Sequence, residues 1–143
     1  MERLFRGVFE HQLDDKGRLR IPAKFKKKLE EFPDKTYSFV RGLKGRIYVF
    51  PDSVLDEILE EIADEKISES SKGSLMLFSS VFPAEEDAQG RVTLPSKLRE
   101  AAKIKKDIVT VGMGKRLEIW SAESYEEYLS GVDYDQEIGK LGI

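Results

Sequence analysis

The sequence predicts an α+β fold in which two copies of one half-domain are related by a pseudo-two-fold axis. A segment typical of a hairpin followed by a helix occurs twice, and each copy is followed by further strand-like and helix-like segments in the same order. The chain has 143 residues, enough for two small halves that share a core. A half of about 65 residues buries too little surface to be comfortably stable alone. We therefore expect interlocked halves, each supplying sheet that the other lacks.

The first copy of the repeated segment is "HQLDDKGRLRIPAKF", residues 11 to 25. Asp14 and Gly17 occupy the first and fourth positions that a type I turn ending on a left-handed residue favours. Strand-like residues lie on both sides of this turn. Pro22 suits the start of a helix, because the first helical N–H has no partner within the helix. The stretch therefore predicts a hairpin and then a helix.

The second copy, residues 82 to 99, matches residues 9 to 26 with a constant offset of 73. Six of the eighteen aligned positions are identical. The identical pairs are Phe9 with Phe82, Asp14 with Asp87, Gly17 with Gly90, Arg18 with Arg91, Pro22 with Pro95 and Lys24 with Lys97. Residues 45 to 59 also match residues 115 to 129 with an offset of 70, so one loop differs by three residues. The duplication predicts two equivalent turns related by the pseudo-axis.

The elements of the first half follow from its hydrophobic periodicity and its breaks. The breaks are "FPDK" at 32 to 35 and "RGLKG" at 41 to 45, which carry Pro or Gly where the chain must turn. We expect strands at 7–13, 18–21, 36–41 and 46–50 and helices at 22–30 and 52–65. The second half repeats this order, with strands at 81–86, 91–94, 108–113 and 116–120 and helices at 95–102 and 122–130.

The remaining segments divide the chain into domains. A Ser-rich stretch with Leu75, Leu77 and Phe78 predicts a short connecting helix within 67–80, and the polar residues 131–143 predict a mobile or partner-docking tail. The predicted domains are thus 5–66 and 81–130.

Composition excludes several classes of site. The chain has no Cys, so it has no disulfide, thiolate ligand or cysteine nucleophile. His11 is the single histidine, and no second His or Cys completes a metal site, so we expect neither a metal nor a cofactor. The sequence has no nucleophile with a base and no Gly-rich phosphate loop, which argues against an enzyme. It also lacks a signal peptide or membrane-spanning apolar run, so we expect a cytoplasmic protein.

Charge is segregated along the chain, although the formal net charge is only -3. Residues 16 to 28 carry seven basic residues and no acid, whereas residues 52 to 65 carry seven acids and no base. The basic segment predicts a cationic face beside the first turn. The acidic helix is interpreted either as a solvated face or as a surface that contacts the basic patch of a neighbouring subunit.

"FRGVFEHQLDDKGRLRIPAKF", together with "DAQGRVTLPSKLR", resembles the MraZ family of bacterial transcriptional regulators, which have two SpoVT/AbrB-type domains with a D-x-x-x-R motif in each. The similarity covers roughly residues 5 to 130. The resemblance implies a duplicated, swapped-hairpin-like β-barrel of the AbrB type with short helices. It also implies ring-shaped homo-oligomers that bind double-stranded DNA with direct repeats, upstream of the division and cell wall operon containing the regulator's own gene.

The family motif falls on Asp14 with Arg18 and on Asp87 with Arg91. Two interpretations of each arginine stay open. It either contacts DNA, where a guanidinium pairs bidentately with guanine or phosphate, or forms an Asp–Arg salt bridge that stabilises the hairpin. The further DNA-contact candidates are the basic residues Lys16, Arg20, Lys24 and Lys97. The lysines on the first helix are interpreted either as phosphate contacts or as a solvated face.

The two copies differ in charge around the motif. Lys16 becomes Gln89 in the second copy, where Glu85 and Glu86 precede the motif. We therefore expect the second copy to bind phosphate more weakly.

The predicted function, as the resemblance implies, is a nucleoid-associated, sequence-specific DNA-binding regulator that represses its own operon. The alternative is a protein-interaction module of the AbrB antitoxin-like type.

Overall fold

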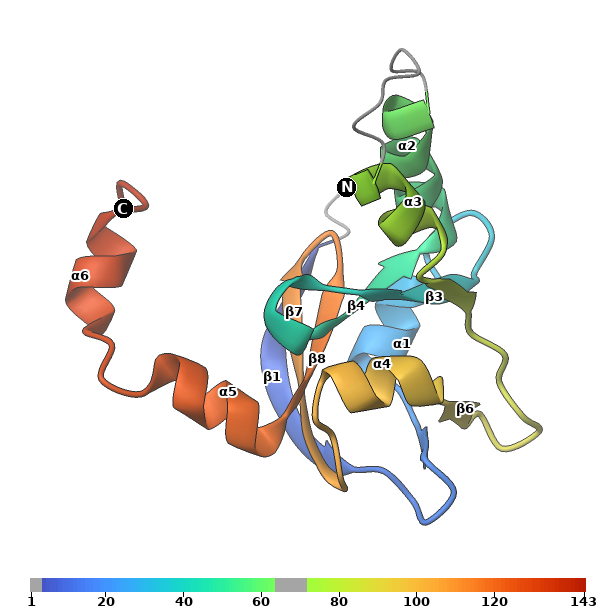
Figure 1. Ribbon diagram of the computed structural model, residues 1–143, viewed down its shortest axis with the longest axis horizontal. Helices are drawn as coiled ribbons and strands as arrows, with labels where there is room; N and C mark the ends of the chain where they lie inside the picture. Colours follow the sequence, from blue (N-terminus) through green and yellow to red (C-terminus); the bar gives the residue numbers. More distant parts are fainter. Residues whose placement is uncertain (1–3, 64–71) are drawn as a thin grey trace.

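The computed structural model describes residues 4–63 and 72–143 and has a mixed α+β architecture, as the sequence predicts (Figure 1). Its strands are β1 (Phe5–Gln12), β2 (Arg18–Leu19), β3 (Tyr37–Arg41), β4 (Ile47–Pro51), β5 (Val81–Pro83), β6 (Val92–Thr93), β7 (Asp107–Gly114) and β8 (Leu117–Ser121). Its helices are α1 (Ala23–Leu29), the 3-10 helix η1 (Leu43–Gly45), α2 (Asp52–Ala63), α3 (Lys72–Phe78), α4 (Ser96–Ala101), α5 (Ala122–Leu129) and α6 (Tyr134–Gly139).

The strands form one large antiparallel sheet of order β1-β7-β8-β4-β3-β5 and a small sheet of β2 and β6. In the duplicated sequence, β5 corresponds to β1, β7 to β3 and β8 to β4. The large sheet therefore has the same order when read from either end. Because β1 pairs with β7 and β5 pairs with β3, the first strand of each half joins the sheet of the other half. The expected interlocking of two halves is thus present in the strand pairing.

The strand register follows the same pseudo-two-fold symmetry. Phe9 lies opposite Thr110, and its counterpart Phe82 lies opposite Phe39. In the small sheet, Leu19 lies opposite its own counterpart Val92, which puts the pseudo-axis between them. The hairpin turn before β2 and the one before β6 are therefore held on either side of this axis.

Both halves contribute to one hydrophobic core. Phe5 of β1 makes an edge contact with Phe25 of α1 at 6.3 Å between ring centroids. The same buried cluster contains Leu98 of α4 and Ile119 of β8, which belong to the second half. Because this core joins residues of both halves, neither half keeps it when separated, which agrees with the small size of each.

A second, smaller cluster lies under α2 and α3. Leu55 of α2 is buried against Val40 and Phe50 of the sheet, and Leu77 of α3 packs against the same group. The helices expected at 52–65 and within 67–80 are therefore present as α2 and α3. Residues 64–65 of the first prediction, and the predicted boundary between 66 and 67, lie outside the described residues.

Several elements differ in length from the predictions. The strands expected at 18–21 and 91–94 are only two residues long, since the prolines that open α1 and α4 follow closely. The strand expected at 81–86 ends at Pro83, which lacks a backbone N–H for continued pairing. The predicted closure of the strands into a swapped-hairpin-like barrel stays a prediction, because no ladder joins β1 to β5 in the described part of the chain.

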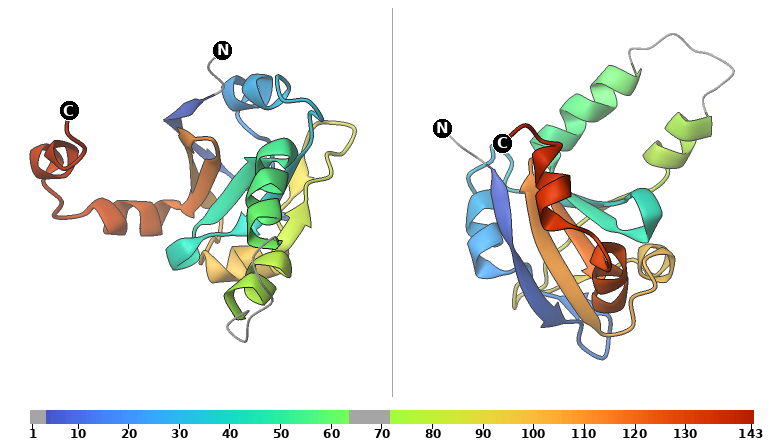
Figure 2. Two further views of the ribbon diagram at one scale, coloured as in Figure 1. Left: turned by 90° about the horizontal axis from the view of Figure 1, so that it is seen from above. Right: turned by 90° about the vertical axis from the view of Figure 1, so that its left-hand side faces the viewer.

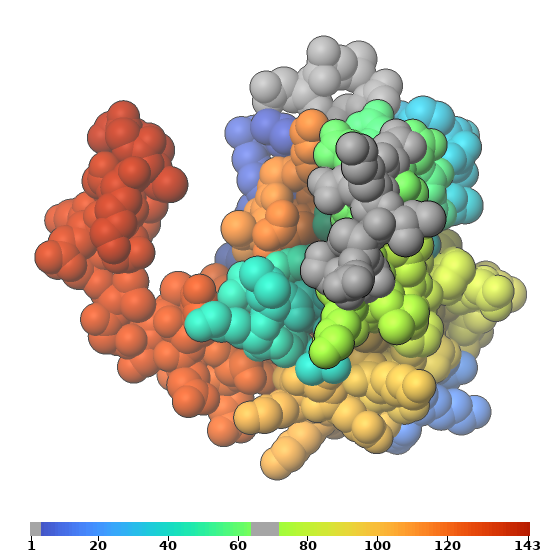
Figure 3. Space-filling view, turned by 45° about the horizontal axis from the view of Figure 1, so that its top comes forward, coloured from blue at the N-terminus to red at the C-terminus, as the bar shows by residue number. Residues whose placement is uncertain are grey.

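The C-terminal residues form an arm that projects from the body (Figure 2). Trp120 of β8 makes an edge contact with Tyr125 of α5 at 5.8 Å, which attaches the base of the arm. The Asp133 carboxylate caps α6, a helix that was not predicted within the tail 131–143. In the space-filling view α6 stands apart from the body (Figure 3), and Tyr134 and Leu141 are 73% and 69% exposed. Among the described helices, none is long and apolar enough to cross a membrane.

Candidate nucleic-acid interface

The first turn has the geometry that its sequence predicts. The Gly17 backbone N–H donates to the Asp14 carbonyl at 3.0 Å, and Gly17 has a φ of 75°, in the left-handed region that favours glycine. One carboxylate oxygen of Asp14 accepts from the backbone N–H groups of Lys16 and Arg18, both at 2.9 Å. Its other oxygen accepts from Arg18 Nε at 2.7 Å. A single aspartate therefore fixes both the turn and the arginine that leaves it.

The second turn reproduces these contacts. Asp87 accepts from the backbone N–H groups of Gln89 and Arg91 at 2.9 Å each, and from Arg91 Nε at 2.9 Å. The Gly90 N–H donates to the Asp87 carbonyl at 3.0 Å, with a φ of 78° at Gly90. The salt bridge considered from the sequence is thus present in both copies.

The carboxylates of both turns are stabilised in their charged form. The Arg18 backbone N–H, together with its guanidinium and the Lys16 N–H, lowers the pKa of Asp14 against an opposing effect of desolvation. The equivalent backbone bond from Arg91 is the main cause that lowers the pKa of Asp87. Each carboxylate therefore stays ionised at neutral pH and holds its arginine by the Nε edge.

In each turn, the ion pair with aspartate leaves N–H donors of the guanidinium without a partner in that pair. A guanidinium has five N–H donors, and the aspartate takes the one on Nε. Nη1 of Arg18 lies 3.9 Å from Oδ2 of Asp87 in the other turn, while the terminal nitrogens of Arg91 donate no hydrogen bond to another described residue. The Arg18 and Arg91 side chains are 24% and 28% exposed. Terminal donors on both arginines are therefore available to a ligand, and the salt bridge is compatible with a binding role.

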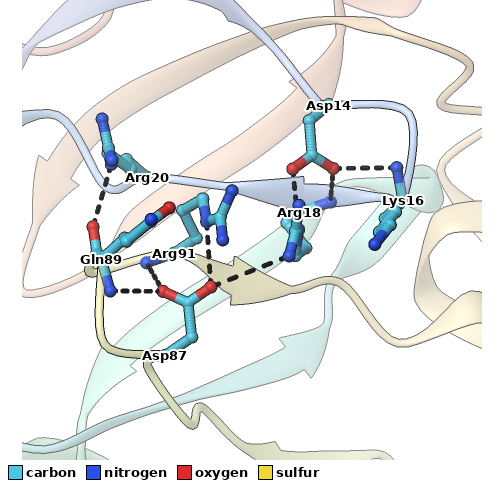
Figure 4. A network of polar contacts seen from close by, with 7 residues as sticks. All are labelled: Asp14, Lys16, Arg18, Arg20, Asp87, Gln89 and Arg91. Carbon is cyan, nitrogen blue, oxygen red and sulfur yellow. Dashed lines mark hydrogen bonds and ion pairs between the residues drawn. The ribbon is translucent and has the colours of Figure 1, made fainter.

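The two turns lie side by side, as the close-up shows (Figure 4). Asp14, Arg18, Asp87 and Arg91 form a row of alternating charges across the pseudo-axis. Arg20, the residue after β2, reaches toward the second turn, where its Nε donates to the Gln89 carbonyl at 3.1 Å. The structure therefore brings together four predicted basic site residues, Lys16, Arg18, Arg20 and Arg91, on one exposed surface.

A family comparison follows the same division of the chain. A family model described as "MraZ protein, putative antitoxin-like" matches residues 4–76 and again residues 77–137, so one turn lies in each matched segment. The chain belongs to the MraZ family. Proteins named transcriptional regulator MraZ are 39% identical over 128 residues in Natranaerobius thermophilus and 38% identical over 141 residues in Symbiobacterium thermophilum. These alignments cover 87% and 96% of this chain and 86% and 99% of the relatives.

Two other predicted basic residues, Lys24 and Lys97, make no hydrogen bond or ion pair with the row of charges within the described residues of this MraZ family member. The Lys24 ammonium lies beside Gly7 of β1, 3.5 Å from where a Cβ would stand. Gly7 is seven residues before Asp14, roughly 20 Å along an extended strand. Lys97 is exposed on α4 and has no ion pair with another described residue. Their contact with DNA stays a prediction.

The acidic residues of the second turn are not equivalent to each other. Glu86 forms an ion pair with the Lys26 ammonium of α1 and accepts a hydrogen bond from the Tyr37 hydroxyl at 2.6 Å. Desolvation alone raises the pKa of Glu86, but the hydrogen bonds from these two partners outweigh it and the pKa is lowered. The negative charge of Glu86 is thus compensated by Lys26. The Lys26 ammonium is therefore not free to contact a phosphate. Glu85 is exposed and keeps an unpaired charge within the described residues.

Two groups of charged residues were not predicted from the sequence. The Arg99 guanidinium, from α4 in the second matched segment, lies against Gly17 in the first turn. Glu118 is buried near the pseudo-axis, where it pairs with Arg46 at 3.2 Å and with Arg116 at 2.6 Å. Arg46 and Arg116 are equivalent positions under the offset of 70. This equivalence was the sequence signal that both could lie near the same acid.

His11 serves the structure of the sheet. Its Nε2 lies 2.7 Å from the Thr110 hydroxyl on the neighbouring strand, and burial lowers its pKa. Within residues 4–63 and 72–143, no group of three or more His, Cys, Asp or Glu side chains is placed to hold a metal ion.

Proposed function

We propose that the chain is a DNA-binding transcriptional regulator and that the paired turns are its DNA-contacting surface. One observation carries the proposal: two arginines on adjacent exposed turns are each held by an aspartate through Nε, while terminal N–H donors stay available. A guanidinium fixed in this way loses little conformational entropy when it binds. Such donors fit guanine O6 and N7 or a phosphate bidentately.

The names of the relatives support regulation of transcription as the biological role. We propose that this chain acts in the cytoplasm at the nucleoid, represses the operon that contains its own gene, and recognises direct repeats upstream of it. Arg18 is the principal base or phosphate contact, with Lys16, Arg20, Lys24 and Lys97 as further phosphate contacts and Arg91 as a weaker one. Phosphate contacts of this kind position a protein on DNA, while base contacts give the sequence preference.

We further propose a ring-like homo-oligomer. The arm of α5 and α6 exposes Tyr128, Val132, Tyr134 and Leu141, and such a run of apolar side chains is typical of a contact surface. The acidic helix α2 and the basic residues near the first turn offer opposite charges to neighbouring subunits. Repetition of one cation-rich turn around a ring would present several contacts to successive DNA repeats.

The second candidate function is a protein-interaction module of the antitoxin-like type. The family description includes this term, and the apolar surface of the C-terminal arm favours a protein partner. Such a module would not distinguish one DNA sequence from another.

A gel-shift experiment with the DNA upstream of the chain's own gene separates the two candidates. The regulator is expected to shift this duplex at concentrations that leave a scrambled duplex of equal length and composition free. Light scattering on the same sample should return a multiple of the 16.4 kDa chain mass. Equal binding to both duplexes, or to neither, would contradict the proposed function, and a stable monomer at micromolar concentration would contradict the ring.

A further inference from the structure

We infer that the first turn and α4 form one composite phosphate-binding site, in which Arg99 is a DNA-contacting residue supplied by the opposite repeat. This inference rests on the proposed function, since the phosphate belongs to the DNA backbone. Arg99 lies outside the D-x-x-x-R motif of either repeat, near the end of α4.

Arg99 lies directly against the first turn. A Cβ atom added to Gly17 would overlap Nη1 of Arg99, and Gly17 is buried within an otherwise exposed turn. The Leu94 backbone N–H donates to the Gly17 carbonyl at 3.0 Å, which ties the segment leading into α4 to this turn. The Arg99 guanidinium therefore lies beside Gly17, the residue between Lys16 and Arg18.

The charge of Arg99 has no partner among the described residues. The ion pairs of this turn join Asp14 and Asp87 to Arg18, and none joins a carboxylate to Arg99. Asp15, the other acid of the turn, also makes no ion pair within the described part of the chain. The two acids and two basic residues at positions 14 to 18 balance in formal charge. Arg99 therefore adds an uncompensated positive charge beside the turn, and this charge attracts an anion. A phosphate fits this requirement, because it accepts two parallel N–H bonds from a guanidinium.

The second turn lacks the equivalent cation. A Cβ added to Gly90 would have no atom of the described residues within 4 Å, so no side chain lies against this glycine as Arg99 lies against Gly17. Lys26 is the counterpart of Arg99 under the offset of 73, and its ammonium is paired with Glu86. The composite site is thus confined to the first turn, and the second turn cannot form it without breaking the Lys26–Glu86 pair.

The test compares Arg99→Gln and Arg99→Lys in the full chain, with Lys115→Gln as a matched control. Lys115 is exposed between β7 and β8, at the end of the sheet opposite the turns, so its replacement removes the same charge elsewhere. The probe is a fluorescent duplex of the DNA upstream of the chain's own gene, titrated at several salt concentrations. Circular dichroism melts verify that each variant is folded.

Arg99→Gln is expected to weaken binding about tenfold at physiological salt, because it removes a charge-assisted hydrogen bond to phosphate. The slope of log affinity against log salt should become less negative by about 0.9 for each phosphate that a chain no longer neutralises. Arg99→Lys should keep the slope, since it keeps the charge, and Lys115→Gln should change neither quantity.

Two results would overturn the inference while leaving the proposed function intact. In the first, the wild type binds specifically and Arg99→Gln behaves like Lys115→Gln. In the second, Arg99→Gln weakens binding with an unchanged salt slope, which is the result of a residue that only supports the turn. If Arg99→Gln is unfolded, Arg99→Met is used in its place and judged by the same two results, since it also removes the charge and keeps a long side chain. Absence of specific binding by the wild type would overturn the proposed function and this inference together.

Discussion

The first and second turns differ less in their own geometry than in what surrounds them. Both hold an arginine through its Nε, at 2.7 Å from Asp14 in the first turn and 2.9 Å from Asp87 in the second. The Arg99 guanidinium lies against Gly17 in the first turn, whereas no described side chain lies against Gly90 in the same way in the second. A local five-residue motif thus sets the backbone and the arginine, while residues from other elements set the charge around it.

The surroundings differ because the two halves are interlocked. Each turn meets a helix of the opposite repeat, so a change in one repeat alters the site of the other. Beside the second turn, Glu86 forms an ion pair with Lys26 of α1 and accepts a hydrogen bond from Tyr37 of β3. This network stabilises the contact between the repeats and removes one cation from the surface. We therefore propose that the first turn is specialised for DNA contact and the second for joining the halves.

The largest effect is expected when the DNA target is shortened from several direct repeats to one. If each chain offers one cation-rich turn, tight binding requires several subunits on successive repeats. Linked contacts of this kind add roughly two to four orders of magnitude in affinity. Fluorescence anisotropy should therefore show a large fall in affinity and a flatter salt slope for the single repeat. Equal affinity and slope for both targets would contradict the multivalent mechanism.

A smaller but more specific effect is expected from the two motif arginines. Arg18→Ala should lower the affinity for the specific duplex about a hundredfold or more, so that specific binding is lost. Each bidentate contact contributes about 1–3 kcal/mol and is repeated in several subunits. Arg91→Ala should weaken binding about tenfold or less, since the exposed acid Glu85 precedes the same turn and makes no ion pair among the described residues. Gel shifts give the affinities.

Circular dichroism melts serve as the control for this pair of variants. Each variant loses an exposed ion pair of the same geometry, so both should melt close to the wild type. A collapse of the Arg18→Ala melt would instead identify the Asp14–Arg18 pair as a structural requirement of the hairpin.

A modest gain is expected when the second turn is given the charges of the first. Glu85→Gln combined with Gln89→Lys removes the unpaired acid and restores the lysine found at position 16. Each additional phosphate contact is weak on its own, so affinity should rise about two- to fivefold and the salt slope steepen. Glu126→Gln combined with Glu127→Gln on α5, with the turn unchanged, is the control for the same change in net charge. No gain beyond that control would mean that the second turn does not approach DNA.

The smallest effect concerns the acid sensitivity of the turns. Because the folded-state pKa of Asp14 and of Asp87 is lowered, each contributes stability above its unfolded value, and this is lost as pH falls through the folded value. Melting temperatures should therefore decline below about pH 4, the ordinary range of an aspartate. Asp14→Asn and Asp87→Asn should each remove a similar small part of this decline. If the two variants removed clearly unequal parts of the decline, the two turns would not be stabilised by the same set of hydrogen bonds.

Local features of the fold were predictable from sequence, because they depend on a few neighbouring residues. Asp14 and Gly17 determine the first turn through bonds within five residues, and Asp87 and Gly90 do the same for the second. The interlocking was also predictable, since a half of this size cannot bury an adequate core. The helix α6 was missed because its six residues carry little apolar periodicity, although Asp133 is a suitable cap.

The charge environment of the candidate site was not predictable in the same way. Arg99 and Gly17 are far apart in sequence and meet only because β2 and β6 pair across the pseudo-axis. For the same reason Glu86 was expected, together with Glu85, to weaken phosphate binding by the second copy, whereas its charge is paired with Lys26. Contacts of this kind depend on the tertiary register, which the alternation of residue types does not determine.

Photocross-linking from equivalent positions of the two turns tests the central claim most directly. Asp15 and Ala88 are equivalent under the offset of 73, and both are exposed in their turns. Each is replaced in turn by a photoreactive residue, and the full chain is irradiated on the duplex upstream of its own gene. The account predicts a high yield of cross-linked DNA from position 15 and a much lower yield from position 88. Equal yields, or a higher yield from position 88, would contradict the specialisation of the first turn for DNA.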